Sequence, residues 1–226
     1  MVKDRLLDPS HKVQRRAQMR LRYALPVVLA FLLPACGAIQ VEKPSFLLSD
    51  VERLSLASIY ESKGENDLAF REYRKALESD SKDIRESAWF AIANLNLRRN
   101  NLDEAEEGFL NAIEINPSKG AYYNNLAWIY MERGEYGRAE DTAMKGLELD
   151  PDTDYMYLDT IGVIQTREEE YVDAEESLLK AASRADASNA GANPLKEIYT
   201  HLSELYELAG DAEKYASMQD RLKGLP

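Results

Sequence analysis

The chain has 226 residues, and its 28 lysines and arginines against 40 aspartates and glutamates give a formal net charge of -12. This acidic balance excludes a typical nucleic-acid-binding protein, because phosphate recognition needs a basic surface. One cysteine and two histidines exclude an intrachain disulfide and a cysteine-based zinc cluster, and they leave a three-ligand catalytic metal site incomplete. The 45% hydrophobic and 30% charged residues indicate a folded, charge-rich body.

The first 35 residues are predicted to be a signal peptide. Seven basic residues lie within residues 1–22, and the apolar run of residues 24–35 follows them. As a helix this run would span about 18 Å, which is too short for a hydrocarbon core of about 30 Å, so it is typical of a signal peptide and not of a membrane span. Because Met19 would by itself begin a compact signal, residues 1–18 are either a long basic leader or a consequence of start-codon choice.

The apolar run ends at Leu33, Pro34, Ala35 and Cys36, the only cysteine of the chain. This segment resembles the bacterial lipobox, in which the cysteine is acylated and becomes the first residue of the mature protein. The resemblance implies lipidation of Cys36. Since Gly37 is not the aspartate that tends to retain lipoproteins at the inner membrane, it favours the outer membrane, facing the periplasm. The alternatives are an ordinary secretory signal with a free cysteine, and an uncleaved anchor.

Cleavage before Cys36 would leave a strongly acidic, membrane-tethered chain. Seven of the 28 basic and two of the 40 acidic residues lie in residues 1–35, so 21 and 38 remain, a net charge of -17. Two acyl chains suffice for stable anchoring. Residues 36–49 are predicted to be the lipidated N-terminus and a linker that reaches at most about 45 Å, so we expect a partner that is itself at the membrane.

From residue 50 onward the sequence predicts helices joined by tight turns. Apolar residues recur at helical spacing, and the proline breaks at Pro117 and Pro151 lie 34 residues apart. Softer breaks divide the units at Gly64, Asn100, Gly134, Glu169 and Gly210. At such breaks glycine or asparagine tolerates positive φ. We therefore predict an all-α fold of about five helix–turn–helix units, at residues 50–83, 86–119, 120–153, 155–188 and 196–226.

Alignment of these units places residues of similar size at the same positions. Small residues occupy the eighth position (Ala57, Ala93, Ala127, Gly162, Ser203) and the twentieth (Ala69, Ala105, Ala139, Ala174), and tyrosine recurs at the eleventh (Tyr60, Tyr130, Tyr206). Small side chains at these positions let paired helices approach closely. The pattern resembles the tetratricopeptide repeat (TPR) over residues 50–222. The resemblance implies a right-handed TPR solenoid whose first helices line a concave groove.

The same resemblance implies a protein or peptide partner in the groove. The predicted groove residues are Phe90, Asn94, Leu97, Arg98, Asn124, Asn125, Trp128, Met131, Asp159, Thr160, Val163 and Arg167. Asparagine amides can both donate to and accept from a peptide backbone, while Phe90, Trp128 and Met131 would supply apolar anchor surface. The alternative is that Asn125 is simply the common residue of its repeat position and that Trp128 packs internally.

Chaperone-binding TPR proteins hold a C-terminal carboxylate with two asparagines and three basic residues. Asn94 and Asn125 match the two asparagines, but Phe90, Met156 and Thr160 stand where the basic residues would be. We therefore do not expect a carboxylate clamp.

No catalytic site, metal site or cofactor is expected. Beyond residue 35 the sequence offers one histidine, no second cysteine, no glycine-rich phosphate loop and no nucleophile elbow. Residues 150–154 lack the glycine and glutamate that would complete a calcium loop and are interpreted as a turn between repeats. Glutamates in residues 104–107, 168–170 and 175–176 are interpreted as a solvated charged face, and His201 as a polar surface residue.

Together, the lipobox and the repeats resemble the pilotin lipoproteins, which help a secretin ring of type IV pili or related systems to assemble. The resemblance implies a membrane-anchored, noncatalytic scaffold with a protein partner, such as a secretin or pilus component, and no nucleic acid. Alternatives in the same class are adaptors for peptidoglycan hydrolases or exopolysaccharide export. Other classes are a carbohydrate-binding protein, a carboxylate-based enzyme and a cytosolic co-chaperone.

Overall fold

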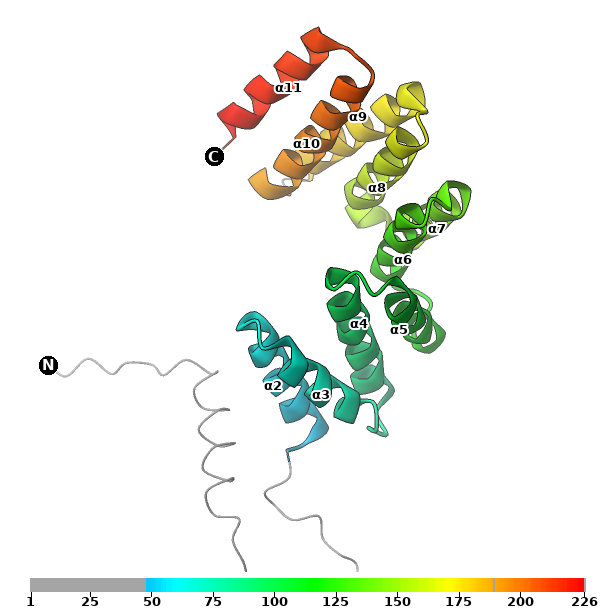
Figure 1. Ribbon diagram of the computed structural model, residues 1–226, viewed down its shortest axis with the longest axis vertical. Helices are drawn as coiled ribbons and strands as arrows, with labels where there is room; N and C mark the ends of the chain where they lie inside the picture. Colours follow the sequence, from blue (N-terminus) through cyan, green and yellow to red (C-terminus); the bar gives the residue numbers. More distant parts are fainter. Residues whose placement is uncertain (1–47, 189, 226) are drawn as a thin grey trace, which may run out of the picture. The chain divides into compact units, whose positions relative to one another are not determined.

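The computed structural model describes residues 48–188 and 190–225 (Figure 1). The predicted signal peptide, Cys36 and the linker as far as residue 47 lie outside the described residues. Within them there are ten α-helices, one short 3-10 helix and no strands. The helices are α2 (Asp50–Ser62), α3 (Asn66–Ala76), α4 (Lys82–Arg98), α5 (Leu102–Ile115), α6 (Gly120–Glu132), α7 (Tyr136–Leu149), η1 (Pro151–Thr153), α8 (Asp154–Arg167), α9 (Tyr171–Ala187), α10 (Ala192–Leu208) and α11 (Ala212–Gly224). The prediction of an all-α fold is confirmed.

The chain divides into two compact units after Ile92, within α4. In the first unit α2 begins with a capping box, in which the Ser49 hydroxyl accepts from the Glu52 backbone N–H at 3.3 Å and the Glu52 carboxylate accepts from the Ser49 N–H at 3.1 Å. Arg53 on α2 donates to Glu72 on α3 at 2.9 Å. This ion pair joins the two helices on one side of their shared apolar contact, which buries Ala69 completely.

Each helical hairpin of the second unit turns through one residue with positive φ. These residues are Asn100 (59°), Gly134 (73°), Glu169 (66°) and Gly210 (75°). Glycine adopts this conformation without steric cost, and asparagine tolerates it better than most residues. The predicted turn positions are confirmed, although Glu169 adopts the left-handed conformation with a full side chain.

Small residues lie where the helices cross. Ala93, Ala127, Ala139 and Ala174 are completely buried. A methyl group added at Gly162 would lie 2.5 Å from Cγ of Leu178, so α8 and α9 approach too closely there for any side chain. The packing that the repeated small residues predicted is confirmed.

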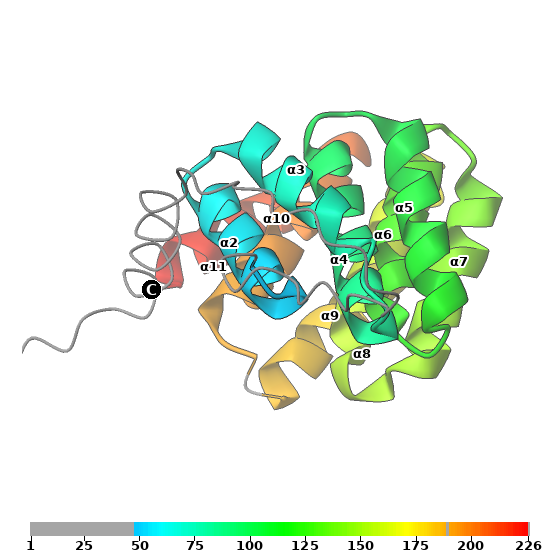
Figure 2. The same ribbon diagram turned by 90° about the horizontal axis from the view of Figure 1, so that it is seen from below.

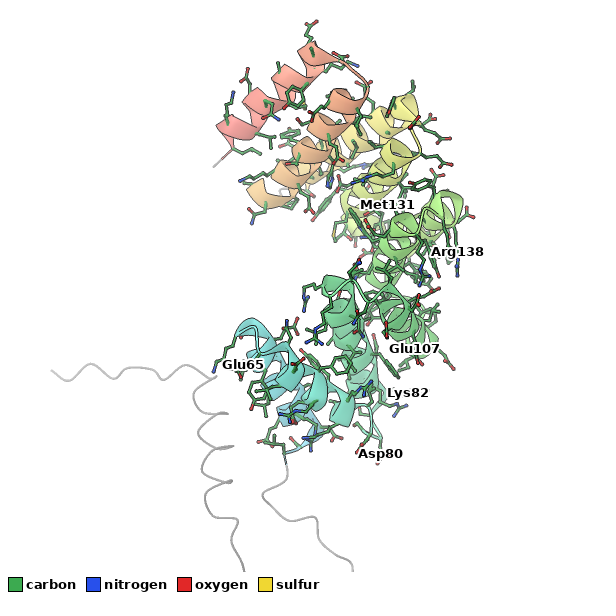
Figure 3. The ribbon with its side chains drawn as sticks, in the orientation of Figure 1. Glu65, Asp80, Lys82, Glu107, Met131 and Arg138 are labelled. Carbon is green, nitrogen blue, oxygen red and sulfur yellow. The ribbon has the colours of Figure 1, made fainter. Side chains whose placement is uncertain are left out.

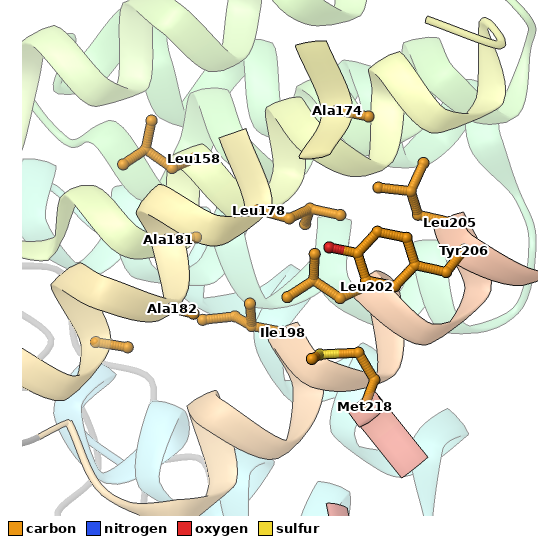
Figure 4. Close-up of a cluster of buried hydrophobic side chains, with 11 residues drawn as sticks. Leu158, Ala174, Leu178, Ala181, Ala182, Ile198, Leu202, Leu205, Tyr206 and Met218 are labelled. Atoms are coloured by element: carbon orange, nitrogen blue, oxygen red, sulfur yellow. The ribbon is translucent and has the colours of Figure 1, made fainter. Parts of the chain in front are cut away.

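The core of the C-terminal part of this unit is a cluster from α8, α9, α10 and α11 (Figure 4). Its buried members are Leu158, Ala174, Leu178, Ala181, Ala182, Ala185, Ile198, Leu202, Leu205, Tyr206 and Met218. Helix α10 contacts both α9 and α11 (Figures 1 and 2), so its apolar residues complete the preceding hairpin as well as its own.

Helix α10 begins earlier than the sequence indicated. The fifth unit was expected from residue 196, but the helix starts at Ala192, directly after Gly191 with a φ of 96°. Pro194 is accommodated because it stands in the first turn, where a backbone N–H has no intrahelical partner. This start places Pro194 and Glu197 on the helix itself.

Polar bridges join the first helices α6, α8 and α10 to the second helix of the preceding hairpin. The Tyr130 hydroxyl on α6 donates to Glu106 on α5 at 3.0 Å. Arg138 of α7, labelled in Figure 3, covers the Tyr130 ring with its guanidinium 3.7 Å from the centroid. At the equivalent positions the Gln165 amide on α8 donates to Glu140 on α7 at 2.8 Å. The eleventh residue of a repeat thus bonds the twenty-first residue of the repeat before it.

The same bridge recurs between α10 and α9, where the Tyr206 hydroxyl donates to Glu175 at 2.8 Å and Lys214 of α11 donates to the same oxygen at 2.6 Å. The Lys214 ammonium, aided by the Tyr206 hydroxyl, lowers the pKa of Glu175 although burial opposes this. At Glu106 burial also raises the pKa, but hydrogen bonds from Arg133 and Tyr130 outweigh it and lower the pKa below the usual range. The interpretation of these two glutamates as a solvated face is therefore wrong.

Candidate functional site

Three first helices of the second unit, α6, α8 and α10, surround a hollow of about 100 Å³. Helix α8 lies between the other two and contacts both. The lining residues are Asn124 and Trp128 from α6, Tyr155, Met156, Asp159 and Thr160 from α8, and Pro194, Glu197 and Ile198 from α10. Four residues of the predicted groove, Asn124, Trp128, Asp159 and Thr160, therefore meet at one place.

Asn124 is the least satisfied polar residue of this hollow. Its side chain is buried, with 8% of the residue exposed, and its Oδ1 atom has no hydrogen-bond partner among the described residues. An unpaired buried acceptor costs about 1–3 kcal/mol, and most buried polar groups in proteins are paired. Asn124 also lines the hollow, so one residue of its wall carries a buried acceptor without a donor.

Asp159 and His201 pair across the contact between α8 and α10. The imidazole Nδ1 lies 2.8 Å from Asp159 Oδ1, and the histidine side chain is 17% exposed. Burial opposes the charge on the ring, but the hydrogen bond with Asp159 and the surrounding carboxylates outweigh it and raise the pKa of His201 above its usual value. His201 is thus a half-buried partner of Asp159, and its interpretation as an independent surface residue is wrong.

The hollow is acidic. Asp159 and Glu197 are among its lining residues, and none of the nine residues that line it is basic. Glu197 also lacks an ion-pair partner within the described part of the chain. Trp128 is half-buried and Met156 is 42% exposed, so an aromatic and an apolar side chain flank these carboxylates. The arrangement can hold a small, positively charged, hydrogen-bond-donating group.

The remaining predicted groove residues of the second unit are less available. Met131 and Val163 are buried, with 4% and 5% of each residue exposed. Met131 therefore does not offer the apolar anchor surface that was expected of it. The Asn125 amide donates to Asn94 Oδ1 at 3.3 Å, so these two asparagines bond each other. Leu97 is half-buried.

Two arginines and one phenylalanine complete the predicted set. Arg98 and Arg167 are exposed, and Arg167 lies 3.4 Å from Glu204 in an ion pair between α8 and α10. Phe90 is half-buried and belongs to the first unit, so it is not part of the hollow.

Helix α10 contributes residues that sequence reasoning missed. Pro194, Glu197 and Ile198 line the hollow, but none of them was among the predicted groove residues. A signal was available, since Glu197 is the second residue of the predicted fifth unit, the position that Met156 holds in the fourth, and Met156 matches a position of the carboxylate clamp. His201 is the sixth residue of the fifth unit, the position that the predicted groove residues Asn125 and Thr160 hold in theirs.

Neither a metal centre nor a membrane span is found within residues 48–188 and 190–225. No group of three or more His, Cys, Asp or Glu side chains there has the arrangement of a metal site. None of the helices described there is long and apolar enough to cross a membrane.

Comparisons with known proteins identify the repeats. One tetratricopeptide-repeat family model matches residues 53–83 and 86–119, and a second matches residues 109–141. No curated protein matches the sequence. The matched models are those of a repeat and indicate no enzyme family.

Several solved structures resemble the chain at low sequence identity. PilF of Pseudomonas aeruginosa is similar with a TM-score of 0.60 and 22% identity, over 77% of this chain and 75% of that protein. PilW, a type IV pilus biogenesis factor, gives a TM-score of 0.53 and 19% identity, over 77% and 92%. YrrB, a TPR protein with an unusual peptide-binding site, gives 0.55 and 18%, over 77% and 84%. At such identities the likeness shows the fold, and with the family models it establishes an all-α TPR solenoid built from tetratricopeptide repeats.

Proposed function

We propose that the chain is a noncatalytic adaptor that binds an extended segment of a protein partner on the face formed by α6, α8 and α10. One observation carries this proposal: the half-buried Trp128 lines a hollow beside the unpaired Oδ1 atom of Asn124. A large aromatic side chain next to an unsatisfied acceptor is typical of a recognition surface, because anchor residues dominate binding energy. Stacked TPR hairpins commonly present such surfaces to peptides.

We further propose that the adaptor works in the bacterial cell envelope, anchored through lipidated Cys36 at the outer membrane, during type IV pilus or secretin assembly. The lipobox-like segment that ends at Cys36 supports the anchoring. The fold shared with PilF and PilW supports the assignment to pilus biogenesis. Loss of palmitate labelling in Cys36→Ser would support the anchor, and equal labelling of both proteins would contradict it.

The adaptor function is tested by affinity capture from detergent-solubilised envelopes, followed by mass spectrometry. We compare the full-length wild type with Trp128→Ala, and with Met144→Ala as a matched control, because Met144 is 49% exposed on α7 and does not line the hollow. A secretin or pilus component captured by the wild type and the control, but lost with Trp128→Ala at unchanged helical content, is the expected result.

Other results separate the alternatives. Capture of peptidoglycan hydrolases or polysaccharide-export proteins in the same Trp128-dependent way would keep the adaptor and contradict the pilus assignment. Equal capture by the wild type and Trp128→Ala would show that the binding face is wrong, and capture of no specific protein would contradict the adaptor function itself.

A further inference from the structure

We propose that the hollow between α6, α8 and α10 is a pocket for a lysine or arginine side chain of the bound segment. This inference deepens the proposed function and rests on it, because it supplies the chemistry by which the partner is recognised. The pocket is defined by the nine lining residues given above.

The size of the pocket limits its occupant to one side chain. Its volume is about 100 Å³. Sites for drug-sized ligands and cofactors usually measure about 300–1,000 Å³, while a cavity of about 150 Å³ holds a molecule of the size of benzene. A single basic head group with part of its aliphatic stem therefore fits, and a larger ligand would extend beyond the hollow.

The acidic lining of the pocket favours a positively charged side chain as its occupant. Asp159 and Glu197 contribute two carboxylates, and the lining contains no lysine or arginine. Asp159 pairs with His201 through Oδ1, and the second oxygen of the carboxylate takes no part in this pair. Asp159 is already paired with His201, so Glu197 is the carboxylate that an anionic or neutral apolar side chain would leave uncompensated on desolvation, while a cation would balance it.

The unpaired amide oxygen of Asn124 selects a donor. Lysine offers three N–H groups and arginine five, and neither residue accepts a hydrogen bond. Oδ1 is covered in the unbound chain, so donation from either head group requires the Asn124 side chain to turn toward the pocket; this would satisfy the one side-chain acceptor that the described residues leave buried and unpaired. This observation is independent of the charge, and it favours the same two residues.

The aromatic wall of the pocket suits a cation as well. Trp128 and Tyr155 are both lining residues, and a cation over an aromatic ring gains about 0.5–2 kcal/mol. Met156 and Thr160, which stand where basic clamp residues would be, line this acidic pocket, which would recognise the opposite charge.

The pocket is tested with short capped peptides whose central residue is varied. The probes are acetyl-Ala-Lys-Ala-amide and acetyl-Ala-Arg-Ala-amide, with norleucine and glutamate in place of the basic residue as controls. Binding to the full-length chain in detergent is followed by the indole N–H resonance of Trp128, with that of Trp89 on α4 as an internal reference. Trp128→Phe assigns the two signals.

We expect the lysine and arginine probes to shift the Trp128 resonance in a saturable manner at about millimolar concentration, as is usual for a ligand of this size. The norleucine and glutamate probes should leave it unchanged. Equal binding of the norleucine probe would show that the pocket recognises apolar surface alone. Absence of any response to the basic probes would overturn the inference.

Two carboxylates on the same helix provide a matched pair of variants. Glu197 lines the pocket, whereas Glu207 is exposed on α10 and does not line it. Removal of the charge in Glu197→Gln should weaken binding of the lysine probe by about 1.5- to fivefold, the range of a solvent-exposed ion pair, while Glu207→Gln leaves it unchanged. Equal weakening by both variants would assign the effect to net charge and refute a specific pocket.

The results distinguish failure of this inference from failure of the proposed function. If Trp128→Ala abolishes capture of the protein partner but the basic probes do not bind, the adaptor function stands and the basic-side-chain pocket is wrong. If the probes bind in the Glu197-dependent way but no protein partner is captured, the pocket stands and the adaptor function is wrong.

Discussion

The crossing of α8 and α9 at Gly162 and Leu178 allows a quantitative test of the packing argument. Leu178 is completely buried, and truncation of a buried leucine to alanine costs about 2–5 kcal/mol, so we take about 3 kcal/mol for Leu178→Ala. In Gly162→Ala the new methyl group would lie 2.5 Å from Leu178 Cγ. Overpacking of this kind costs about 1–3 kcal/mol, while alanine gains about 1 kcal/mol of helix propensity, so the net cost is about 1 kcal/mol.

The double variant should be more stable than the sum of the two single changes predicts. Independent effects would add to about 4 kcal/mol. With Leu178 truncated, however, the new methyl group no longer meets Cγ, it fills part of the cavity, and the propensity gain remains, so we expect about 2 kcal/mol in total. Rescue stays incomplete because the methyl group would still lie 3.3 Å from the carbonyl oxygen of Ala174.

Urea unfolding of the full-length chain, followed by circular dichroism, measures the four free energies of this cycle. Gly137→Ala serves as the control, because a methyl group at Gly137 on α7 would have no atom within 4 Å and its effect should add to that of Leu178→Ala. A double variant within about 0.5 kcal/mol of additivity would refute the reasoning, since it would mean that Gly162 and Leu178 do not share a contact.

Two further predictions concern polar pairs. Tyr206→Phe removes the hydroxyl that donates to Glu175 and should cost about 1 kcal/mol in urea unfolding, whereas Tyr171→Phe, whose hydroxyl has no partner among the described residues, should cost almost nothing. Because the pKa of His201 is raised by its pairing with Asp159, His201 stabilises the fold below about pH 6.5 and this contribution is lost as the pH rises through the folded-state pKa. The stability difference between wild type and His201→Gln should therefore shrink from about pH 5.5 to pH 8, and a constant difference would contradict the pairing.

The repeat architecture was predictable because it depends on positions that every unit shares. Small residues at the helix crossings and turn residues between helices recur at fixed spacing. Each can be recognised within a single repeat, because its role depends on its own size or backbone conformation. The face of each first helix followed from the same register. That register assigned Asn124, Trp128, Asp159 and Thr160 of two repeats to the predicted groove, and the structure brings these four residues to one hollow.

What escaped prediction depends on neighbours from other repeats. Asp159 and His201 are 42 residues apart, and only the packing of α8 against α10 makes them a pair. Met131 stands at a groove position of its helix yet is buried, because helical periodicity gives the direction of a side chain but not what covers it. Glu106 lies among other glutamates in the sequence, and the hydroxyl and guanidinium groups that pair with it come from the next hairpin.

The geometry of the proposed pocket depends on the polar bridges, because these bridges help to place the three helices that line it. A basic side chain in the pocket would contact residues of α6, α8 and α10 at once, so its affinity depends on the relative positions of these helices. Gln165 ties α8 to Glu140 of α7, and Tyr206 ties α10 to Glu175 of α9. The Asp159–His201 and Arg167–Glu204 pairs join α8 to α10 directly. No second helix lines the pocket, so the bridges to the second helices lie outside it, while Asp159 both pairs with His201 and lines the pocket. We therefore expect loss of a bridge to weaken binding of lysine and arginine alike, whereas substitution of a lining residue such as Glu197 should change which side chain is bound.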